Sequence, residues 1–200
     1  MKIVRDELLI KKGDFFDSRA FNEILLEIKE AISKVVWPLG SGQFSINPKA
    51  KGNGVKPIKN DCMSHLETLG WELEHRFSVT SGMRPGPLDA TKVIENRLMA
   101  LEWETGNISS SHRAINKMAL GILNESLIGG ILILPSRAMY KYLTDRVGNF
   151  QEIEPYFPVW KNLKIEYGYL CIIEIEHDSE NIETPLILKG TDGWAEYQKV

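Results

Sequence analysis

Cysteine is rare in this sequence of 200 residues, in which only Cys62 and Cys171 occur. The two form no CxxC pair, and the four histidines are dispersed, so no zinc site with the usual ligand spacing is expected. A secreted domain stabilised by several disulfides is excluded on the same ground. We expect both thiols to be small buried groups in a reducing compartment.

Long hydrophobic runs are also absent, since no stretch approaches the roughly 18 consecutive apolar residues of a transmembrane helix. The N-terminal sequence MKIVRDELLIKKGDFF places acids where a secretion signal would need an apolar core. We therefore expect a cytoplasmic protein without a membrane partner. No internal repeat or long linker divides the chain, which predicts a single domain over residues 1–200.

A basic surplus, typical of nucleic-acid-binding proteins, is missing, because the formal net charge is −3. The charge is unevenly distributed. Residues 1–150 hold 20 Lys and Arg against 17 Asp and Glu, whereas residues 151–200 hold 4 against 10. The composition thus permits a local DNA-binding patch in the first three quarters of the chain but does not by itself suggest one.

Hydrophobic periodicity and turn residues predict alternating helices and strands. Helices are predicted over residues 19–37, from Asn60 or Asp61 to about Arg76, over 109–124 and over 136–143. Strands are predicted over 98–104, 128–134, 164–176 and 185–188, and residues 39–58 read as an extended loop. This order indicates an α/β fold with a mixed central β-sheet flanked by helices.

Three carboxylates have the spacing of a metal-dependent active site. Asp89 precedes the sequence Glu102-Trp103-Glu104, which lies on a predicted strand. Because side chains alternate across a strand, Glu102 and Glu104 project from one face and Trp103 from the other. Asp89 on a neighbouring strand or turn can bring a third carboxylate to the same point. Converging carboxylate oxygens suit Mg²⁺, a hard cation that acts together with a substrate phosphate.

This arrangement matches the needs of phosphodiester hydrolysis. One or two metal ions activate water and stabilise charge on the phosphate. Asp89 and Glu102 are the expected metal ligands, with the Trp103 carbonyl as a third, and Glu104 orients or deprotonates the attacking water. Spacing alone also allows a pair of exposed acids on an edge strand, or an enzyme that acts on a small phosphate ester.

A longer pattern resembles a known family. The segment from Glu102 to Lys117, EWETGNISSSHRAINK, resembles the active-site and recognition segment of the BamHI family of type II restriction endonucleases. Matching blocks keep the same order along the chain: Trp37-Pro38, Asn53-Gly54-Val55, Pro57-Ile58-Lys59, Gly86 to Asp89, Tyr142 to Val147, Asn149-Phe150, Glu154 to Phe157, Pro185 to Ile187 and Lys189-Gly190.

The resemblance implies a PD-(D/E)XK nuclease with a restriction-endonuclease-like core. Asp89 then matches the aspartate that binds metal, Glu102 the second ligand, and Glu104 the glutamate that stands where most relatives have lysine. Glu74 aligns, more loosely, with a fourth acidic residue near the metal ions. An ordinary solvated helix acid is the alternative for Glu74.

The same resemblance assigns DNA recognition to Asn107, Ser109 and Arg113 and to Asp145 with Arg146. These residue types can read base edges, since arginine donates two bonds to guanine and a carboxylate accepts from cytosine N4. The implied target is the palindrome GGATCC in double-stranded DNA, cut to leave 5′ overhangs with one or two Mg²⁺ per active site.

A palindrome presents two equivalent half-sites, which favours a homodimer. Lys59, with the nearby Lys51 and Lys56, is expected to contact phosphate or else to be a solvated loop lysine. The remaining alternative is a sequence-specific DNA-binding module of the same fold that does not cleave.

Overall fold

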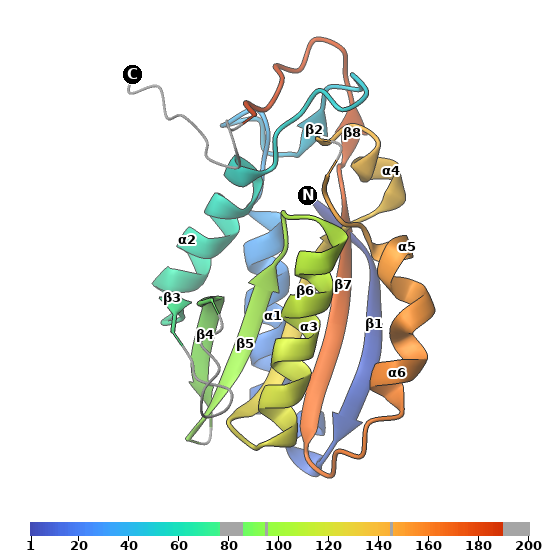
Figure 1. The fold of residues 1–200 in the computed structure, drawn as a ribbon. Helices are drawn as coiled ribbons and strands as arrows, with labels where there is room; N and C mark the ends of the chain where they lie inside the picture. The colour runs from blue at the N-terminus through green and yellow to red at the C-terminus, as the bar shows by residue number, and fades with distance from the viewer. Residues whose placement is uncertain (77–85, 95, 145, 190–200) are drawn as a thin grey trace.

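The centre of the protein is a six-stranded sheet (Figure 1), seen in a computed structural model that describes residues 1–76, 86–94, 96–144 and 146–189. In spatial order the strands are β1 (Lys2–Lys12), β7 (Gly168–Glu176), β6 (Leu127–Pro135), β5 (Arg97–Trp103), β4 (Leu88–Ile94) and β3 (Glu72–His75). Strands β5, β6 and β7 are mutually parallel, and the other neighbouring pairs are antiparallel. The predicted mixed sheet is confirmed.

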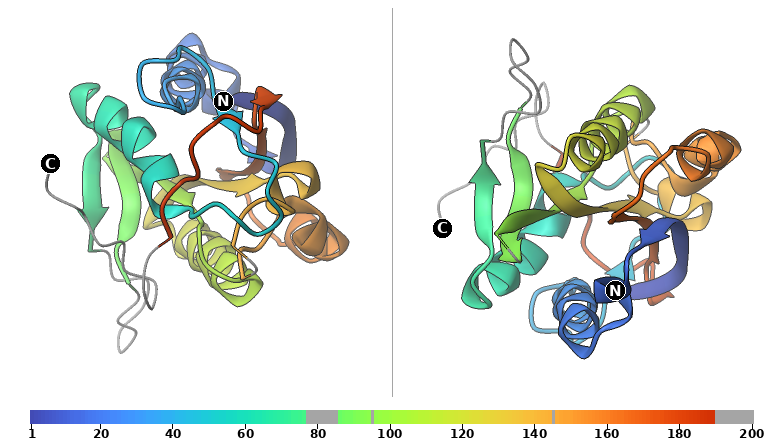
Figure 2. Two further views of the ribbon diagram at one scale, coloured as in Figure 1. Left: turned by 90° about the horizontal axis from the view of Figure 1, so that it is seen from above. Right: turned by 90° about the horizontal axis from the view of Figure 1, so that it is seen from below.

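Helices cover both faces of the sheet (Figure 2). Helices α1 (Arg19–Ser33) and α2 (Asn60–Thr68) lie on one face, and α3 (Ile108–Leu123), α5 (Phe150–Ile153) and α6 (Phe157–Lys161) lie on the other. The short elements are η1 (Asp14–Asp17), η2 (Lys56–Lys59), α4 (Arg137–Tyr140), η3 (Glu154–Tyr156) and the two-stranded pair of β2 (Ser45–Ile46) and β8 (Ser179–Glu180). Each face has its own buried apolar cluster, so the fold is a three-layer α/β/α arrangement.

Strand β6 forms the middle of this arrangement and is buried along its whole length. Ile131 and Ile133 pack with the α1 and α2 cluster, whereas Leu132 and Leu134 pack with the α3 cluster. Its sequence therefore shows a continuous apolar run rather than an alternating one, as expected for a parallel strand covered on both faces.

Gly130 lets helix α3 approach the sheet closely. A β-carbon at this position would lie 2.7 Å from the sulfur of Met118 and 2.8 Å from its β-carbon. Since Met118 lies on α3, this contact sets the distance between the helix and strand β6. The same helix carries Arg113 and Lys117, which line the pocket described below.

We expect Gly130→Ala to destabilise the protein by about 1–3 kcal/mol, because the added methyl group overpacks the contact with α3. Urea unfolding followed by circular dichroism measures this change. Gly86→Ala is the matched control, since a β-carbon at Gly86 meets no atom of the described residues within 4 Å. Equal stability of the two variants would contradict the expectation.

The predicted helix from residue 60 to about 76 was wrong in its second half. Helix α2 ends at Thr68, and Gly70 has a φ of +83° that L side chains rarely adopt. The chain then reverses into strand β3, which pairs with β4 through Leu73 and Ala90. Gly70 therefore ends the helix, although the helical spacing of apolar residues in the sequence continues beyond it.

Other boundaries also differ from the sequence-based expectations. The first strand, β1, and the helices between residues 150 and 161 were not predicted. Residues 185–188 form no strand, and Ile187 instead makes hydrogen bonds with Asn53 and Gly54. The helices expected over 19–37 and 136–143 are shorter, and the strand expected from 164 begins at 168.

Cys62 and Cys171 are buried free thiols, as predicted. No helix within the described residues has the length and apolar character needed to cross a bilayer.

Candidate active site

Asp89 and Glu102 lie side by side on the antiparallel strands β4 and β5. The neighbouring pair of Ala90 and Leu101 fixes their register. The Asp89 N–H donates to Glu102 Oε2 at 3.2 Å, and the Trp103 N–H donates to Asp89 Oδ2 at 2.8 Å. The strand pairing thus places two carboxylates, which are 13 residues apart in the sequence, within one hydrogen-bonded group.

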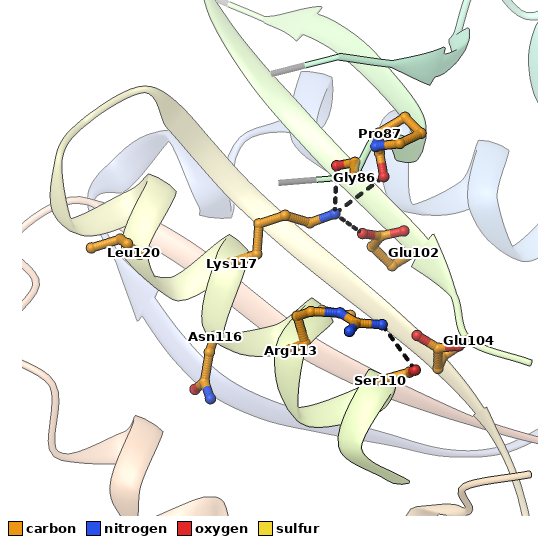
Figure 3. Close-up of a pocket in the computed structure, with 10 residues that line it drawn as sticks. Gly86, Pro87, Glu102, Glu104, Ser110, Arg113, Asn116, Lys117 and Leu120 are labelled. Carbon is orange, nitrogen blue, oxygen red and sulfur yellow. Dashed lines mark hydrogen bonds and ion pairs between the residues drawn. The ribbon is translucent and has the colours of Figure 1, made fainter. Parts of the chain in front are cut away.

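Glu102 and Glu104 line the same pocket, which has a volume of about 650 Å³ (Figure 3). Trp103 instead packs into the apolar cluster on the other face of the sheet. The predicted alternation of these three side chains is therefore seen in the structure. The pocket lies between the end of β5 and helix α3, which supplies Arg113 and Lys117.

Two lysines neutralise the paired carboxylates. Lys117 Nζ lies 2.5 Å from Glu102 Oε1, and Lys59 Nζ donates to Asp89 Oδ1 at 2.7 Å. Lys117 also donates to the carbonyl oxygens of Gly86 at 3.3 Å and Pro87 at 3.2 Å. Lys59, predicted to be either a phosphate contact or a solvated loop lysine, is thus half-buried and paired with Asp89, a candidate metal ligand.

The two glutamates of the pocket have raised pKa values. Burial, followed by the charge of Asp89, raises the pKa of Glu102 to about 7, although Lys117 opposes the shift. Burial also raises the pKa of Glu104, against the hydrogen bond from Gly106. Burial would lower the pKa of Lys59, but the charge and hydrogen bond of Asp89 raise it above its usual value. A cluster of such perturbed groups in a pocket is typical of a functional site.

Gly106 holds the Glu104 carboxylate in place. Its N–H donates to Glu104 Oε1 at 2.7 Å, and a β-carbon on Gly106 would lie 2.8 Å from the same oxygen. The contact uses Oε1, whereas Oε2 accepts no hydrogen bond from the described residues and can take another partner.

Glu74 lies on strand β3 rather than on the helix that the sequence suggested. It is exposed and has a positive φ of 52°. Its charge is among those that raise the pKa of Lys59, together with the charges of Asp89 and Glu102. Glu74 therefore lies within electrostatic range of the acidic group, and its role as a metal ligand stays a prediction.

The first predicted recognition segment lies at the N-terminus of helix α3. Asn107 caps the helix, accepting from the Ser110 N–H at 3.1 Å, and Ser109 and Arg113 are exposed. Arg113 donates to the Ser110 hydroxyl at 3.0 Å (Figure 3). The free backbone N–H groups and the dipole at this end of a helix favour an anion such as phosphate.

The second predicted recognition segment adjoins the first. Arg146 is exposed, whereas Asp145 lies outside the described residues. The Gly148 N–H donates to the Gly106 carbonyl at 2.8 Å, and a β-carbon on Gly148 would lie 3.1 Å from Ile108 Cα. The structure thus places the two predicted recognition segments in contact with each other, close to Glu104.

The acids do not form a ready-made metal cluster in the part of the chain that the structure describes. No three carboxylate, imidazole or thiol groups among those residues are close enough to hold a metal ion together. The donor set nevertheless fits a hard divalent cation, because carboxylates are its preferred ligands and two of them already bind cationic groups.

Sequence reasoning did not single out Lys117. Its position in the sequence could have indicated a role in the site, because Lys117 follows Arg113 by four residues and so lies on the same side of helix α3. It also lies beside the apolar stripe that includes Ala114 and Met118, where a lysine is unusual unless it is paired.

A mixed sheet between helices, with paired acids at the ends of adjacent strands, defines the restriction-endonuclease-like class of α/β proteins. The crystal structure of restriction endonuclease BglII complexed with a DNA 16-mer matches this fold with a TM-score of 0.60. The match covers 88% of this chain and 79% of that chain at 10% sequence identity, which shows the fold alone.

The chain belongs to the BamHI family of type II restriction endonucleases. The sequence model of the family described as restriction endonuclease BamHI matches residues 1–194. The type II restriction enzyme OkrAI of Oceanobacter kriegii is 60% identical over 195 residues, covering 98% of this chain and 99% of its own length. The type II restriction enzyme BamHI of Bacillus amyloliquefaciens is 38% identical over 195 residues, which cover 94% of this chain and 86% of its own length.

Proposed function

We propose that this restriction endonuclease cuts both strands of double-stranded DNA at the palindrome GGATCC, leaves 5′ overhangs and uses Mg²⁺. The observation that carries the proposal is the pairing of Asp89 with Glu102 beside Glu104, directly before the segment that begins at Asn107. An enzyme for a small phosphate ester would need the acids but not the adjoining Arg113 and Arg146 segments.

In this proposal Asp89, Glu102, Glu74 and the Trp103 carbonyl hold the metal ions. Bound Mg²⁺ would polarise the scissile phosphate and make a nearby water more acidic. Glu102 lies in a buried environment, which strengthens its interaction with any cation.

Glu104 is the proposed general base. Gly106 fixes its Oε1, which leaves Oε2 to accept a proton from the attacking water. Burial raises the pKa of Glu104 above the usual value, which makes the carboxylate a stronger base.

Asn107, Ser109 and Arg113, with Asp145 and Arg146, are the proposed base-reading residues, and Lys59 is a proposed phosphate contact. The N-terminus of α3 would enter the major groove, where the donor and acceptor pattern distinguishes all four base pairs. We propose a homodimer of single-domain subunits, because two-fold symmetry matches a palindrome.

Digestion of a duplex with one GGATCC site, in Mg²⁺ and separately in Ca²⁺, tests the proposal. A duplex with one changed base pair in the site is the control. Two products with staggered ends, obtained only from the intact site in Mg²⁺, are expected. Uncut DNA that is retained specifically in a gel shift would identify a binding module, and neither cutting nor retention would refute the proposal.

A further inference from the structure

Lys117 is surrounded by oxygen atoms in a way that resembles the environment of a metal ion. Its Nζ contacts a carboxylate oxygen of Glu102 at 2.5 Å and the carbonyl oxygens of Gly86 and Pro87 at 3.3 and 3.2 Å. Both charged side chains are only 10% exposed. Carboxylate and carbonyl oxygens are also the ligands that hard divalent cations take.

Asp89 is occupied in the same way by a second ammonium group, that of Lys59. Two lysine charges thus balance two carboxylates that the proposed function assigns to a divalent cation. One divalent ion would replace both ammonium groups without changing the charge balance at Asp89 and Glu102. Among the described residues, Asp89 and Glu102 each pair with a lysine, and no third ligating group joins them in a metal cluster.

We infer that Lys117 occupies the position beside Glu102 that a divalent cation would take, and that it must leave Glu102 when the metal binds. This inference rests on the proposed function. The displaced side chain stays in the pocket that Arg113 also lines, one helical turn away, so its charge becomes available to a DNA phosphate there (Figure 3). Lys117 is in this sense a positioning residue, since it acts through Glu102.

Removing the ammonium group should increase the response of the DNA-free protein to a metal ion. In Lys117→Met, the buried Glu102 carboxylate loses its partner, which destabilises the protein. Added Ca²⁺ supplies the missing charge without first displacing a lysine. We expect Ca²⁺ to raise the Tm of this variant by roughly twice or more the wild-type shift, and its Ca²⁺ dissociation constant to be roughly tenfold lower.

Lys161→Met is the matched control, because its Nζ pairs with Glu7 Oε1 at 2.6 Å on a partly exposed surface of α6. Its Ca²⁺ response should equal that of the wild type. Lys117→Gln, which keeps an N–H donor but no charge, serves as a second variant if Lys117→Met is poorly folded. Both variants should be rescued by Ca²⁺, so failure of both to fold in saturating Ca²⁺ would overturn the inference.

The outcomes also separate this inference from the proposed function. If the wild type cuts DNA but the Lys117 variants respond to Ca²⁺ no more than the wild type does, only the role of Lys117 is wrong. If the wild type does not cut and no protein responds to Ca²⁺, the metal site itself is wrong, and both proposals fall.

Discussion

Glu104→Gln is expected to lower the rate of cleavage at GGATCC by about 10²–10⁴-fold, because the amide cannot accept the proton of the attacking water. The substitution keeps an oxygen that can accept from the Gly106 N–H, so the segment that begins at Asn107 should stay in place. Specific binding in Ca²⁺ should therefore persist. Single-turnover cleavage assays and gel shifts measure the two properties separately.

Glu67→Gln is the control for this variant, since it removes the same charge from an exposed position on α2. Asp89→Asn should reproduce the loss of cutting with retained binding, because it removes one charge from the proposed metal site. If both site variants lost specific binding while their folds remained intact, the assigned roles would be wrong.

Arg146→Ala is expected to weaken binding to the GGATCC duplex by about 1–3 kcal/mol if its guanidinium makes a bidentate contact with guanine. Binding to a duplex of unrelated sequence should change little. Titrations of both duplexes at one salt concentration give the two free energies, because the phosphate contribution depends strongly on salt.

Arg19→Ala controls for the loss of one positive charge. The Arg19 side chain is 93% exposed at the start of α1, which lies on the face of the sheet opposite to α3. This variant should bind both duplexes like the wild type. An equal loss on the specific and the unrelated duplex would make Arg146 a phosphate contact rather than a reader of bases.

The carboxylates of the candidate site were predictable because they depend on local rules. Strand alternation placed Glu102 and Glu104 on one side of Trp103, and an antiparallel neighbour brought Asp89 beside Glu102. The two lysines were not predictable in this way, since their pairing depends on where η2 and α3 pack against the strand ends.

The fold was predictable where the hydrophobic pattern was strong, as in β6 and α3. It was misread after Thr68, where Gly70 reverses the chain although helical spacing continues. Strand β1 was missed because, in the part of the chain that the structure describes, it pairs only with β7, and its exposed residues hide the hydrophobic pattern. Pairing between segments so far apart in the sequence cannot be recognised from the residue pattern of either segment alone.

The position of β7 in the sheet determines when the sheet can be completed during synthesis of the chain. Strand β7 lies between β1, at the start of the chain, and β6, so neither can pair with it until Gly168–Glu176 has been made. Until then the wholly apolar β6 has an unpaired edge, and such an edge promotes aggregation. A ribosome-bound chain that stops before β7 therefore has the acids and both lysines but lacks the finished sheet that positions them.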